Sequence, residues 1–300
     1  MPPKLVILSG PTAVGKSAFA AQIARIFQTR IISADSRQCY RELNIGTAKP
    51  PAILLEEIPH YFINSHSIHH PVHASDFESL GLAYAREIFL HRAVGIVCGG
   101  TGLYIKALCD GLDQIPGVDP GLKEKVASQY RQLGLGWLQE SVRSRDPEYY
   151  ASSDIRNPRR LLRALEVCLS TGKPFSSFRT GKKAHRPFSM LRIAFKLPGE
   201  TLRSRINRRV DAMISQGLVE ECEGLRAYRG KPVLQTLGYQ EIFTYLDGNS
   251  TLGEAVERIK SNTWQYARRQ MTWLRGQKDW IWMDPGEEEK NLRVIREFAN

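Results

Sequence analysis

The chain begins with a short apolar run that changes into a helical pattern within a few residues. Residues 4–9 (KLVILS) read as a buried strand, and apolar residues then return at helical spacing from Lys16 to about Phe27. Residues 31–33 and 94–98 are two further apolar runs of strand length. Strands that alternate with helices in this way predict an α/β fold built on a parallel sheet.

The pattern between and beyond these strands predicts further elements. Residues 44–74 contain four prolines and read as irregular, and Ser75 with Glu78 reads as a capping box for a helix that runs to about Arg92. Later in the chain the pattern predicts a strand at 191–197, helices at 202–213 and 252–273, and a last strand at 280–282.

The middle of the chain has a different pattern. Residues 112–121 are rich in Gly, Pro and Asp, as a domain boundary is, and residues 122–169 read as helical. Four arginines at 156, 159, 160 and 163 are spaced to share one helix face. We therefore predict three segments: the first part of the core at 1–111, an inserted helical domain at 112–188, and the second part of the core with C-terminal helices at 189–300.

A phosphate-binding motif links the first strand to the first helix. Residues 10–17 (GPTAVGKS) match G-x-x-x-x-G-K-S in its required context, between a strand and a helix. The backbone N–H groups of such a loop surround a polyphosphate, Lys16 adds a positive charge, and the Ser17 hydroxyl is a ligand for Mg²⁺. The loop predicts a bound diphosphate or triphosphate, whether or not that group belongs to a nucleotide. Its predicted contacts are Gly10, Pro11, Thr12, Ala13, Val14, Gly15, Lys16 and Ser17.

Two side chains follow other predicted strands and should lie at the same sheet edge, because ligands of open α/β sheets bind outside the carboxyl ends of the strands. Asp35 comes directly after the strand at 31–33, where it would hold Mg²⁺ or act as a general base. The alternative is that Asp35, with Ser36, caps a helix. Thr101 lies in a glycine-rich turn after the strand at 94–98 and could bind phosphate or a substrate amine, or serve the turn alone.

Two arginines extend this phosphate chemistry. Arg205 and Arg209 are four residues apart and share a helix face. Paired guanidinium groups suit a diphosphate leaving group, although a solvent-exposed helix face would also carry them.

Charge is concentrated in one part of the sequence. The formal net charge is +11, and residues 155–210 alone contain 15 lysines and arginines against 2 acidic residues. A concentrated basic region is typical of proteins that bind a polyanion, and we expect a nucleic acid; a merely solubilising face is the alternative.

Cysteine spacing and hydropathy indicate where the protein acts. The five cysteines form no C-x-x-C pair, which argues for reduced thiols in the cytoplasm and against a structural zinc. No apolar run approaches the roughly 20 residues of a membrane span, and no signal peptide is evident. We therefore expect a cytoplasmic protein with no membrane partner.

Seven segments form an ordered series along the chain: GPTAVGKS (10–17), ADSRQCYRELNIGTAKP (34–50), GGTGLYIKAL (99–108), NPRRLLRALEVCLSTGKPFS (157–176), INRRVDAMISQGLVEE (206–221), LQTLGYQEI (234–242) and TWQYARRQMTWLR (263–275). A phosphate loop alone is common, but the ordered series is highly specific. With this series the chain resembles the bacterial tRNA dimethylallyltransferases, also called tRNA isopentenyltransferases.

The resemblance implies a P-loop NTPase-like core with an inserted helical tRNA-binding domain. It implies transfer of a dimethylallyl group from dimethylallyl diphosphate to N6 of the adenosine on the 3′ side of the anticodon, in tRNAs that read codons beginning with U. The phosphate loop would then hold the prenyl diphosphate with Mg²⁺ and would not hydrolyse ATP. The partners would be the tRNA anticodon stem-loop and the prenyl donor, and we expect a monomer.

The resemblance also implies roles for individual residues. Asp35 is the general base, and Thr101 and Arg209 complete the catalytic set, with Arg205 beside the diphosphate. The implied tRNA contacts are Asp35, Ser36, Arg37, Gln38, Thr101, Lys123, Arg159, Arg160, Leu161, Leu162 and Arg163. The chain departs from the family pattern at Asn157, where an acidic residue is common, and near Gly199, where an arginine is common.

Three alternatives remain at this point. A P-loop kinase of a small molecule also has a phosphate loop and a nearby aspartate, but it needs no basic inserted domain. An adenylate dimethylallyltransferase of the cytokinin-forming type uses a free nucleotide as acceptor. A non-catalytic RNA-binding module would not need two glycine-rich phosphate turns at one sheet edge.

Overall fold

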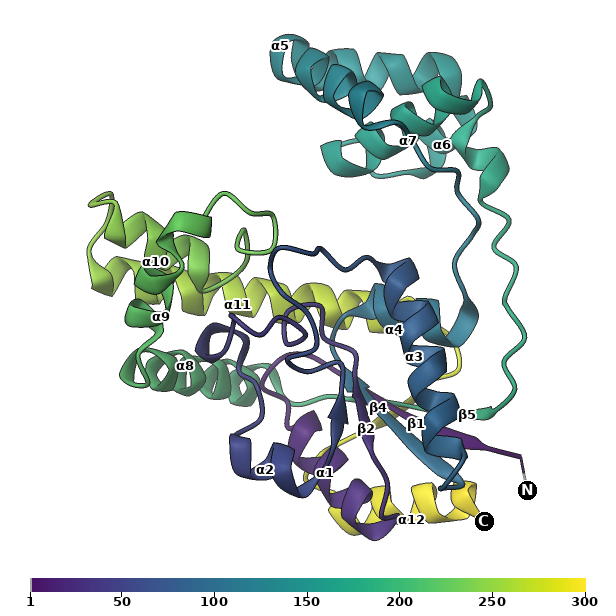
Figure 1. Ribbon diagram of the computed structural model, residues 1–300, viewed down its shortest axis with the longest axis vertical. Coiled ribbons are helices and arrows are strands. Elements are labelled where there is room, and N and C mark those ends of the chain that lie inside the picture. Colours follow the sequence, from purple (N-terminus) through teal and green to yellow (C-terminus); the bar gives the residue numbers. More distant parts are fainter. Residues whose placement is uncertain (1) are drawn as a thin grey trace. The chain divides into compact units, whose positions relative to one another are not determined.

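The computed structural model describes residues 2–300, and the chain divides into two compact units (Figure 1). The first unit comprises Met1–Cys109 and His185–Asn300, and the second comprises Asp110–Ala184. None of the helices in residues 2–300 combines the length and apolar character that crossing a bilayer requires.

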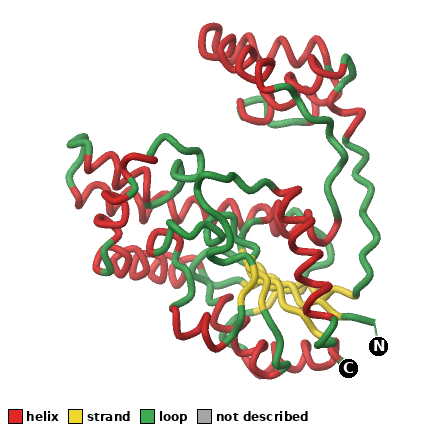
Figure 2. The backbone as a smooth tube through the Cα atoms, in the orientation of Figure 1, coloured by secondary structure: helices red, strands yellow, loops and turns green. Residues whose placement is uncertain are grey.

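The first unit is built on a six-stranded sheet in which every pair of neighbouring strands is parallel. The predicted α/β fold with a parallel sheet is therefore confirmed. The strand order is β3-β2-β4-β1-β5-β6, and all six strands (yellow in Figure 2) belong to this unit. The strands are β1 (Lys4–Ser9), β2 (Ile31–Ser33), β3 (His60–Tyr61), β4 (Val94–Gly99), β5 (Ser189–Phe195) and β6 (Ile281–Met283).

Helices cover both faces of this sheet, which explains why the central strands β1 and β4 are buried along almost their whole length. Helices α1 (Lys16–Ile26) and α12 (Glu288–Ala299) lie on one face, and α3 (Ala74–Phe89) and α4 (Gly102–Asp110) lie on the other (Figure 1). The Phe77 and Tyr104 rings stack between α3 and α4 with their centroids 4.4 Å apart.

The rest of the first unit is helical. Helix α8 (Gly199–Ser215) and helix α11 (Leu252–Arg275) carry side chains to the carboxyl edge of the sheet. These elements are η1 (Ile45–Thr47), α2 (Ala52–Glu57), α8 (Gly199–Ser215), α9 (Leu218–Gly224), η3 (Arg226–Tyr228), α10 (Tyr239–Leu246) and α11 (Leu252–Arg275).

The second unit consists of helices around a hydrophobic core of its own, which includes Leu138, Leu161 and Leu165. Its elements are α5 (Pro120–Arg145), α6 (Pro147–Ser152), α7 (Pro158–Thr171) and η2 (Phe175–Phe178). Asp146 is buried, and its carboxylate accepts hydrogen bonds from the backbone N–H groups of Tyr149 and Ser176 and from the Ser176 hydroxyl. That carboxylate caps α6 and ties η2 to it.

Two local predictions about the first unit are wrong. Residues 44–74 are not irregular throughout, because they contain η1, α2 and the edge strand β3. Helix α3 does not use Ser75 and Glu78 as a capping box: the Asp76 carboxylate accepts from the His73 N–H at 2.7 Å, so the cap lies two residues earlier. Glu78 is instead paired with Arg186, at 2.6 Å.

Arg156 does not share a helix face with the other three arginines. Helix α7 begins at Pro158, and Asn157 is its N-cap, with its side-chain oxygen 3.4 Å from the Arg160 N–H. Asn is a favoured N-cap residue, and proline is favoured at the first helical position, so the helix starts after Arg156.

The basic run at 155–210 does not belong to one domain. Residues 155–184 lie in the second unit and residues 185–210 in the first. Taken as a whole, the second unit contains 13 lysines and arginines against 9 acidic residues, a net charge of +4. The prediction of a strongly basic inserted domain therefore overestimates its charge, because 7 of the 15 lysines and arginines in this run belong to the sheet unit.

Candidate active site

The sheet places three loops at one edge. Ser9 at the end of β1 is in register with Gly99 at the end of β4, and Ser33 at the end of β2 is in register with Cys98. The loops that begin at Gly10, Ala34 and Gly100 therefore leave the sheet side by side at the carboxyl ends of its strands, where α/β proteins bind ligands.

The phosphate loop occupies residues 10–15 between β1 and α1. Gly10 and Gly15 have φ angles of +154° and +111°, in the region that glycine favours, and a Cβ on Gly10 would lie 2.9 Å from the Phe195 carbonyl oxygen. The Lys16 ammonium donates to the carbonyl oxygens of Gly10 (2.9 Å) and Pro11 (2.7 Å). Burial lowers the pKa of this ammonium to about 8. The loop thus brings a positive charge and backbone N–H groups together in one small space.

Helix α8 brings both predicted arginines to this loop. Arg205 donates to the Val14 carbonyl oxygen at 3.1 Å, and Arg209 donates to the Thr12 hydroxyl at 3.0 Å. Burial lowers the pKa of the Arg209 guanidinium, and the nearby Asp35 carboxylate partly offsets that effect. The two side chains lie on the loop and do not form a merely solvent-exposed helix face.

Asp35 is positioned by the turn that follows β2. One carboxylate oxygen, Oδ1, accepts hydrogen bonds from the N–H groups of Arg37 (2.8 Å) and Gln38 (3.3 Å). Residues 36–39 form a turn, so the alternative in which Asp35 caps a helix does not hold. Within residues 2–300, the other oxygen, Oδ2, accepts no hydrogen bond. Asp35 thus has one anchored oxygen and one oxygen available for proton transfer.

Thr101 joins the second glycine-rich turn to the Asp35 segment. Its hydroxyl oxygen accepts from the Ser36 N–H at 3.0 Å, and its own N–H donates to the Ala34 carbonyl oxygen at 3.1 Å. A Cβ on Gly99 would lie 2.2 Å from that carbonyl oxygen, so only glycine permits the close approach. Thr101 and Asp35 therefore lie together at one place on the edge, which we call the Asp35–Thr101 corner.

Gln270 of α11 is a site residue that the sequence analysis did not single out. Its side chain, 8% exposed, accepts from the Thr12 N–H at 2.8 Å and donates to the Gly100 carbonyl oxygen at 2.9 Å. A Cβ on Gly100 would lie 2.2 Å from the Gln270 nitrogen. Gln270 thus bridges the phosphate loop and the Thr101 turn. The sequence does contain a signal for Gln270: it is a polar residue on the largely apolar face of helix α11, where a buried polar side chain needs hydrogen-bond partners.

The predicted tRNA contacts of the second unit are distributed differently. Lys123, Arg159 and Arg160 are exposed, whereas Leu161 is 0% exposed and part of the core. Leu162 is half-buried, and Arg163 donates to the Pro116 carbonyl oxygen at 3.2 Å. The exposed surface of helix α7 near its start is therefore charged rather than hydrophobic. The predicted contact of the Leu161 side chain with tRNA is wrong, because this side chain is buried in the core.

Comparison with known proteins identifies a family for this arrangement. The model of the IPP transferase family matches residues 38–277. A tRNA dimethylallyltransferase of Cytophaga hutchinsonii is 44% identical over 283 residues, covering 94% of this chain and 93% of that protein. A tRNA dimethylallyltransferase 1 of Bacteroides thetaiotaomicron is 40% identical over 98% of this chain and 96% of its own length.

Solved structures agree with this result. The full-length tRNA isopentenylpyrophosphate transferase of Bacillus halodurans is 31% identical, with a TM-score of 0.73 over 99% of this chain and 96% of that one. A eukaryotic dimethylallyltransferase acting on tRNA is 27% identical, with a TM-score of 0.76 over 91% of this chain and 70% of that one. The chain belongs to the IPP transferase family, whose curated relatives are tRNA dimethylallyltransferases.

Proposed function

We propose that this protein transfers the dimethylallyl group of dimethylallyl diphosphate to N6 of the adenosine on the 3′ side of the anticodon, in tRNAs that read codons beginning with U. The products are N6-isopentenyladenosine and diphosphate. One observation carries the proposal beyond family membership: the phosphate loop and the Asp35–Thr101 corner meet at one sheet edge, so donor and acceptor sites are adjacent.

The diphosphate end of the donor binds in the phosphate loop. The Lys16 ammonium, held by its own loop carbonyls, exchanges one of them for a phosphate oxygen, and Arg209 lies 3.0 Å from Thr12 on the same loop. Arg205, bound to Val14, adds a second guanidinium. These three positive charges stabilise the negative charge that develops on the leaving diphosphate.

The acceptor end is the Asp35–Thr101 corner. N6 attacks C1 of the dimethylallyl group, the C1–N6 bond forms, and the C1–O bond breaks with its electron pair leaving on the diphosphate. The proton lost by N6 passes to the unpaired Oδ2 of Asp35, while Oδ1 keeps the carboxylate oriented. The adenosine must leave the stack of the anticodon loop to reach this corner.

The residues present also suit Mg²⁺ beside the diphosphate. Ser17 is exposed at the first turn of α1, and Mg²⁺ typically binds one or two protein oxygens together with substrate phosphates and waters. No cluster of three or more His, Cys, Asp or Glu side chains suited to a metal occurs among residues 2–300, so Ser17 would act with the substrate. A bound Mg²⁺ would neutralise charge on the diphosphate.

We assign tRNA binding outside the corner to the second unit. Lys123 of α5 and Arg159 and Arg160 of α7 are exposed cations that can contact phosphates, and Arg163 also lies on α7. Ser36, Arg37 and Gln38 lie next to Asp35 and would touch the target nucleotide. We also propose action as a monomer in the cytoplasm, where tRNA is found; all five cysteines are buried and none forms a disulfide, as expected of a reducing compartment.

A labelled donor separates this function from its alternatives. The protein is incubated with labelled dimethylallyl diphosphate and Mg²⁺, with either unmodified tRNA or AMP as acceptor. We expect label in tRNA and none in AMP. Label in AMP alone would make the protein an adenylate dimethylallyltransferase, and ATP hydrolysis without prenyl transfer would make it a P-loop kinase or ATPase.

A further inference from the structure

Three of the segments that match the family, 34–50, 206–221 and 234–242, meet at one loop of the first unit. We propose that Glu221 is a positioning residue for nucleotide recognition: it holds the loop 44–48, and this loop orients the Gln38 side chain beside Asp35. The inference rests on the proposed function, because it assigns a role in binding the tRNA acceptor.

Glu221 of α9 accepts hydrogen bonds from three consecutive backbone N–H groups. One carboxylate oxygen, Oε2, lies 3.1 Å from the Asn44 nitrogen and 2.8 Å from the Ile45 nitrogen, and the other, Oε1, lies 3.2 Å from the Gly46 nitrogen. These N–H groups begin the short helix η1 and have no partner within it. A carboxylate that satisfies all three fixes the position of the loop 44–48.

Tyr239 of α10 also supports the loop 44–48, through Glu221 and through its own ring. Its hydroxyl donates to Glu221 Oε1 at 2.6 Å, and its ring is 0% exposed. A Cβ on Gly46 would lie 2.5 Å from this ring, so the glycine is what lets the loop rest against it. Glu221 and Tyr239 thus hold the loop 44–48 together: Glu221 through hydrogen bonds and Tyr239 through packing against Gly46.

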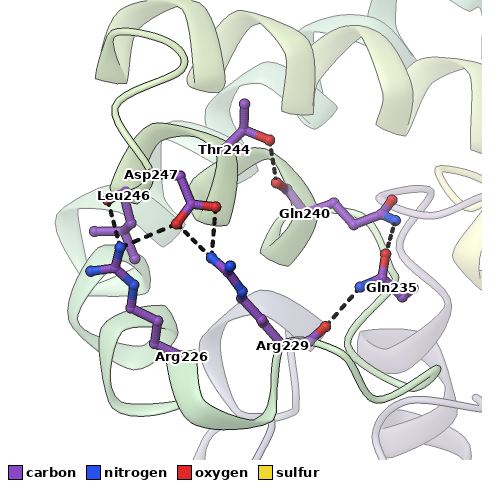
Figure 3. A network of polar contacts seen from close by, with 7 residues as sticks. All are labelled: Arg226, Arg229, Gln235, Gln240, Thr244, Leu246 and Asp247. Carbon is purple, nitrogen blue, oxygen red and sulfur yellow. Dashed lines mark hydrogen bonds and ion pairs between the residues drawn. The ribbon is translucent and has the colours of Figure 1, made fainter.

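The segment that joins these two residues is itself held in place. Arg226 and Arg229 both bind the Asp247 carboxylate, the latter through contacts of 2.5 and 2.7 Å (Figure 3). Arg229 also accepts, through its carbonyl oxygen, a hydrogen bond from Gln235 at 2.7 Å. The chain from α9 to α10 is therefore closed into a compact loop, which presents Glu221 and Tyr239 together.

The loop 44–48 passes this restraint to Gln38. The Gln38 amide nitrogen lies 3.2 Å from the carbonyl oxygens of both Thr47 and Ala48, and its amide oxygen lies 3.2 Å from the Ser33 hydroxyl. Two carbonyl acceptors on one side set the orientation of the amide, because a flipped amide would face them with its own oxygen. Both N–H bonds of the Gln38 amide then point to the carbonyl oxygens of Thr47 and Ala48. The group that Gln38 can offer to a bound nucleotide is therefore a lone pair of its amide oxygen.

A restrained acceptor of this kind selects a hydrogen-bond donor on the bound nucleotide, such as an exocyclic amine. The Gln38 backbone N–H also donates to Asp35 Oδ1 at 3.3 Å, so a shift of Gln38 would disturb the oriented oxygen of the general base. Glu221 acts on recognition through this chain of contacts and touches neither substrate.

The test is a double-mutant cycle in the full chain, with kcat and KM measured separately for unmodified tRNA and for dimethylallyl diphosphate. We expect Glu221→Gln to lower kcat/KM for tRNA about 10-fold or more, because an amide cannot accept from all its present donors. The KM for dimethylallyl diphosphate should stay within about 2-fold. On a Gln38→Met background the loss caused by Glu221→Gln should largely disappear, since both changes break the same chain of contacts.

Two further variants make the result specific. Glu223→Gln removes the same charge from an exposed position of the same helix and should leave both kinetic constants unchanged. Tyr239→Phe keeps the ring against Gly46 and removes the hydroxyl, with its bonds to Glu221 and to the Gly46 backbone, so it should lower kcat/KM for tRNA about 3-fold even if Glu221→Gln folds poorly.

Several outcomes would overturn the inference. An additive loss on the Gln38→Met background, or an equal rise in the KM for the prenyl donor, would make Glu221 a general structural residue. Wild-type activity on tRNA with no effect of Glu221→Gln or Tyr239→Phe would remove the role while leaving the proposed function intact. A wild-type protein that transfers no prenyl group to tRNA would remove both.

Discussion

The sheet edge of the first unit and helix α7 of the second unit both present positive charge, but they hold it in different ways. At the sheet edge, Lys16, Arg205 and Arg209 each donate to the phosphate loop, and burial lowers the pKa of Lys16 and Arg209. On α7, Arg159 and Arg160 are exposed and make no ion pair within residues 2–300. Groups that take part in a reaction gain from fixed positions, whereas groups that attract a polyanion need only remain accessible.

Asp35 should give the largest effect, because it is the only group that we assign to proton transfer. Asp35→Asn keeps an oxygen for the N–H groups of Arg37 and Gln38 and removes the base. We expect kcat to fall about 10²- to 10⁴-fold while tRNA affinity changes less than about 2-fold. Single-turnover transfer and filter binding measure the two quantities. Near-normal turnover would show that another group takes the proton.

Lys16 provides a pH-dependent test of the buried charge. Its pKa is lowered to about 8, so the free enzyme loses this positive charge as the pH rises through 8. Above that pH we expect kcat/KM for dimethylallyl diphosphate to fall, by at most about 10-fold per pH unit.

The matched control is Lys16→Arg, which keeps its charge across this range and should show no such fall. The same pKa shift predicts that the free energy of unfolding rises between pH 8 and 10.5, because the unfolded chain binds the proton more tightly there. Equal pH profiles for the wild-type and Lys16→Arg proteins would exclude Lys16 as the titrating group.

Gln270 tests whether the two halves of the sheet edge must be coupled. Gln270→Met has similar length but leaves the Thr12 N–H and the Gly100 carbonyl without their partner, at a cost of about 1–3 kcal/mol for each unsatisfied group. We expect kcat/KM to fall about 10-fold for both substrates. Gln265→Met, at an exposed position of the same helix, is the control and should have no effect. A loss confined to the tRNA constants would place Gln270 in recognition alone.

The arginines of α7 should give the smallest effect and a different kind of effect. Replacing Arg159 and Arg160 with Gln should raise the KM for tRNA several-fold and leave kcat unchanged. The slope of log affinity against log salt concentration should become shallower by about 0.7–0.9 for each phosphate that the variant no longer binds. Arg131→Gln, in the same unit but paired with Glu124, is the control. A fall in kcat instead would assign these arginines a part in the reaction.

Local patterns in the sequence were reliable where they depend on neighbouring residues. The strands at 4–9, 31–33 and 94–99, and the glycine-rich loops after them, were predictable because hydrophobic runs and turn residues act over a few positions. The start of α7 and the cap of α3 were mispredicted because several side chains compete for one cap. Asp76 occupies the position at α3, while Glu78 pairs with Arg186, 108 residues away.

The sequence by itself determined the phosphate loop, the placement of Asp35 and Thr101 after their strands, and the family. Only the tertiary structure decided that Gln270 bridges residues 258 and 170 positions away, that Glu221 holds a loop about 176 positions earlier, and that the basic run is divided between two units. The physical reason is that a short motif depends only on the conformation and hydrogen bonds of its own few residues. A hydrogen bond between distant segments depends on which segments the packed core brings together, and no local spacing encodes that.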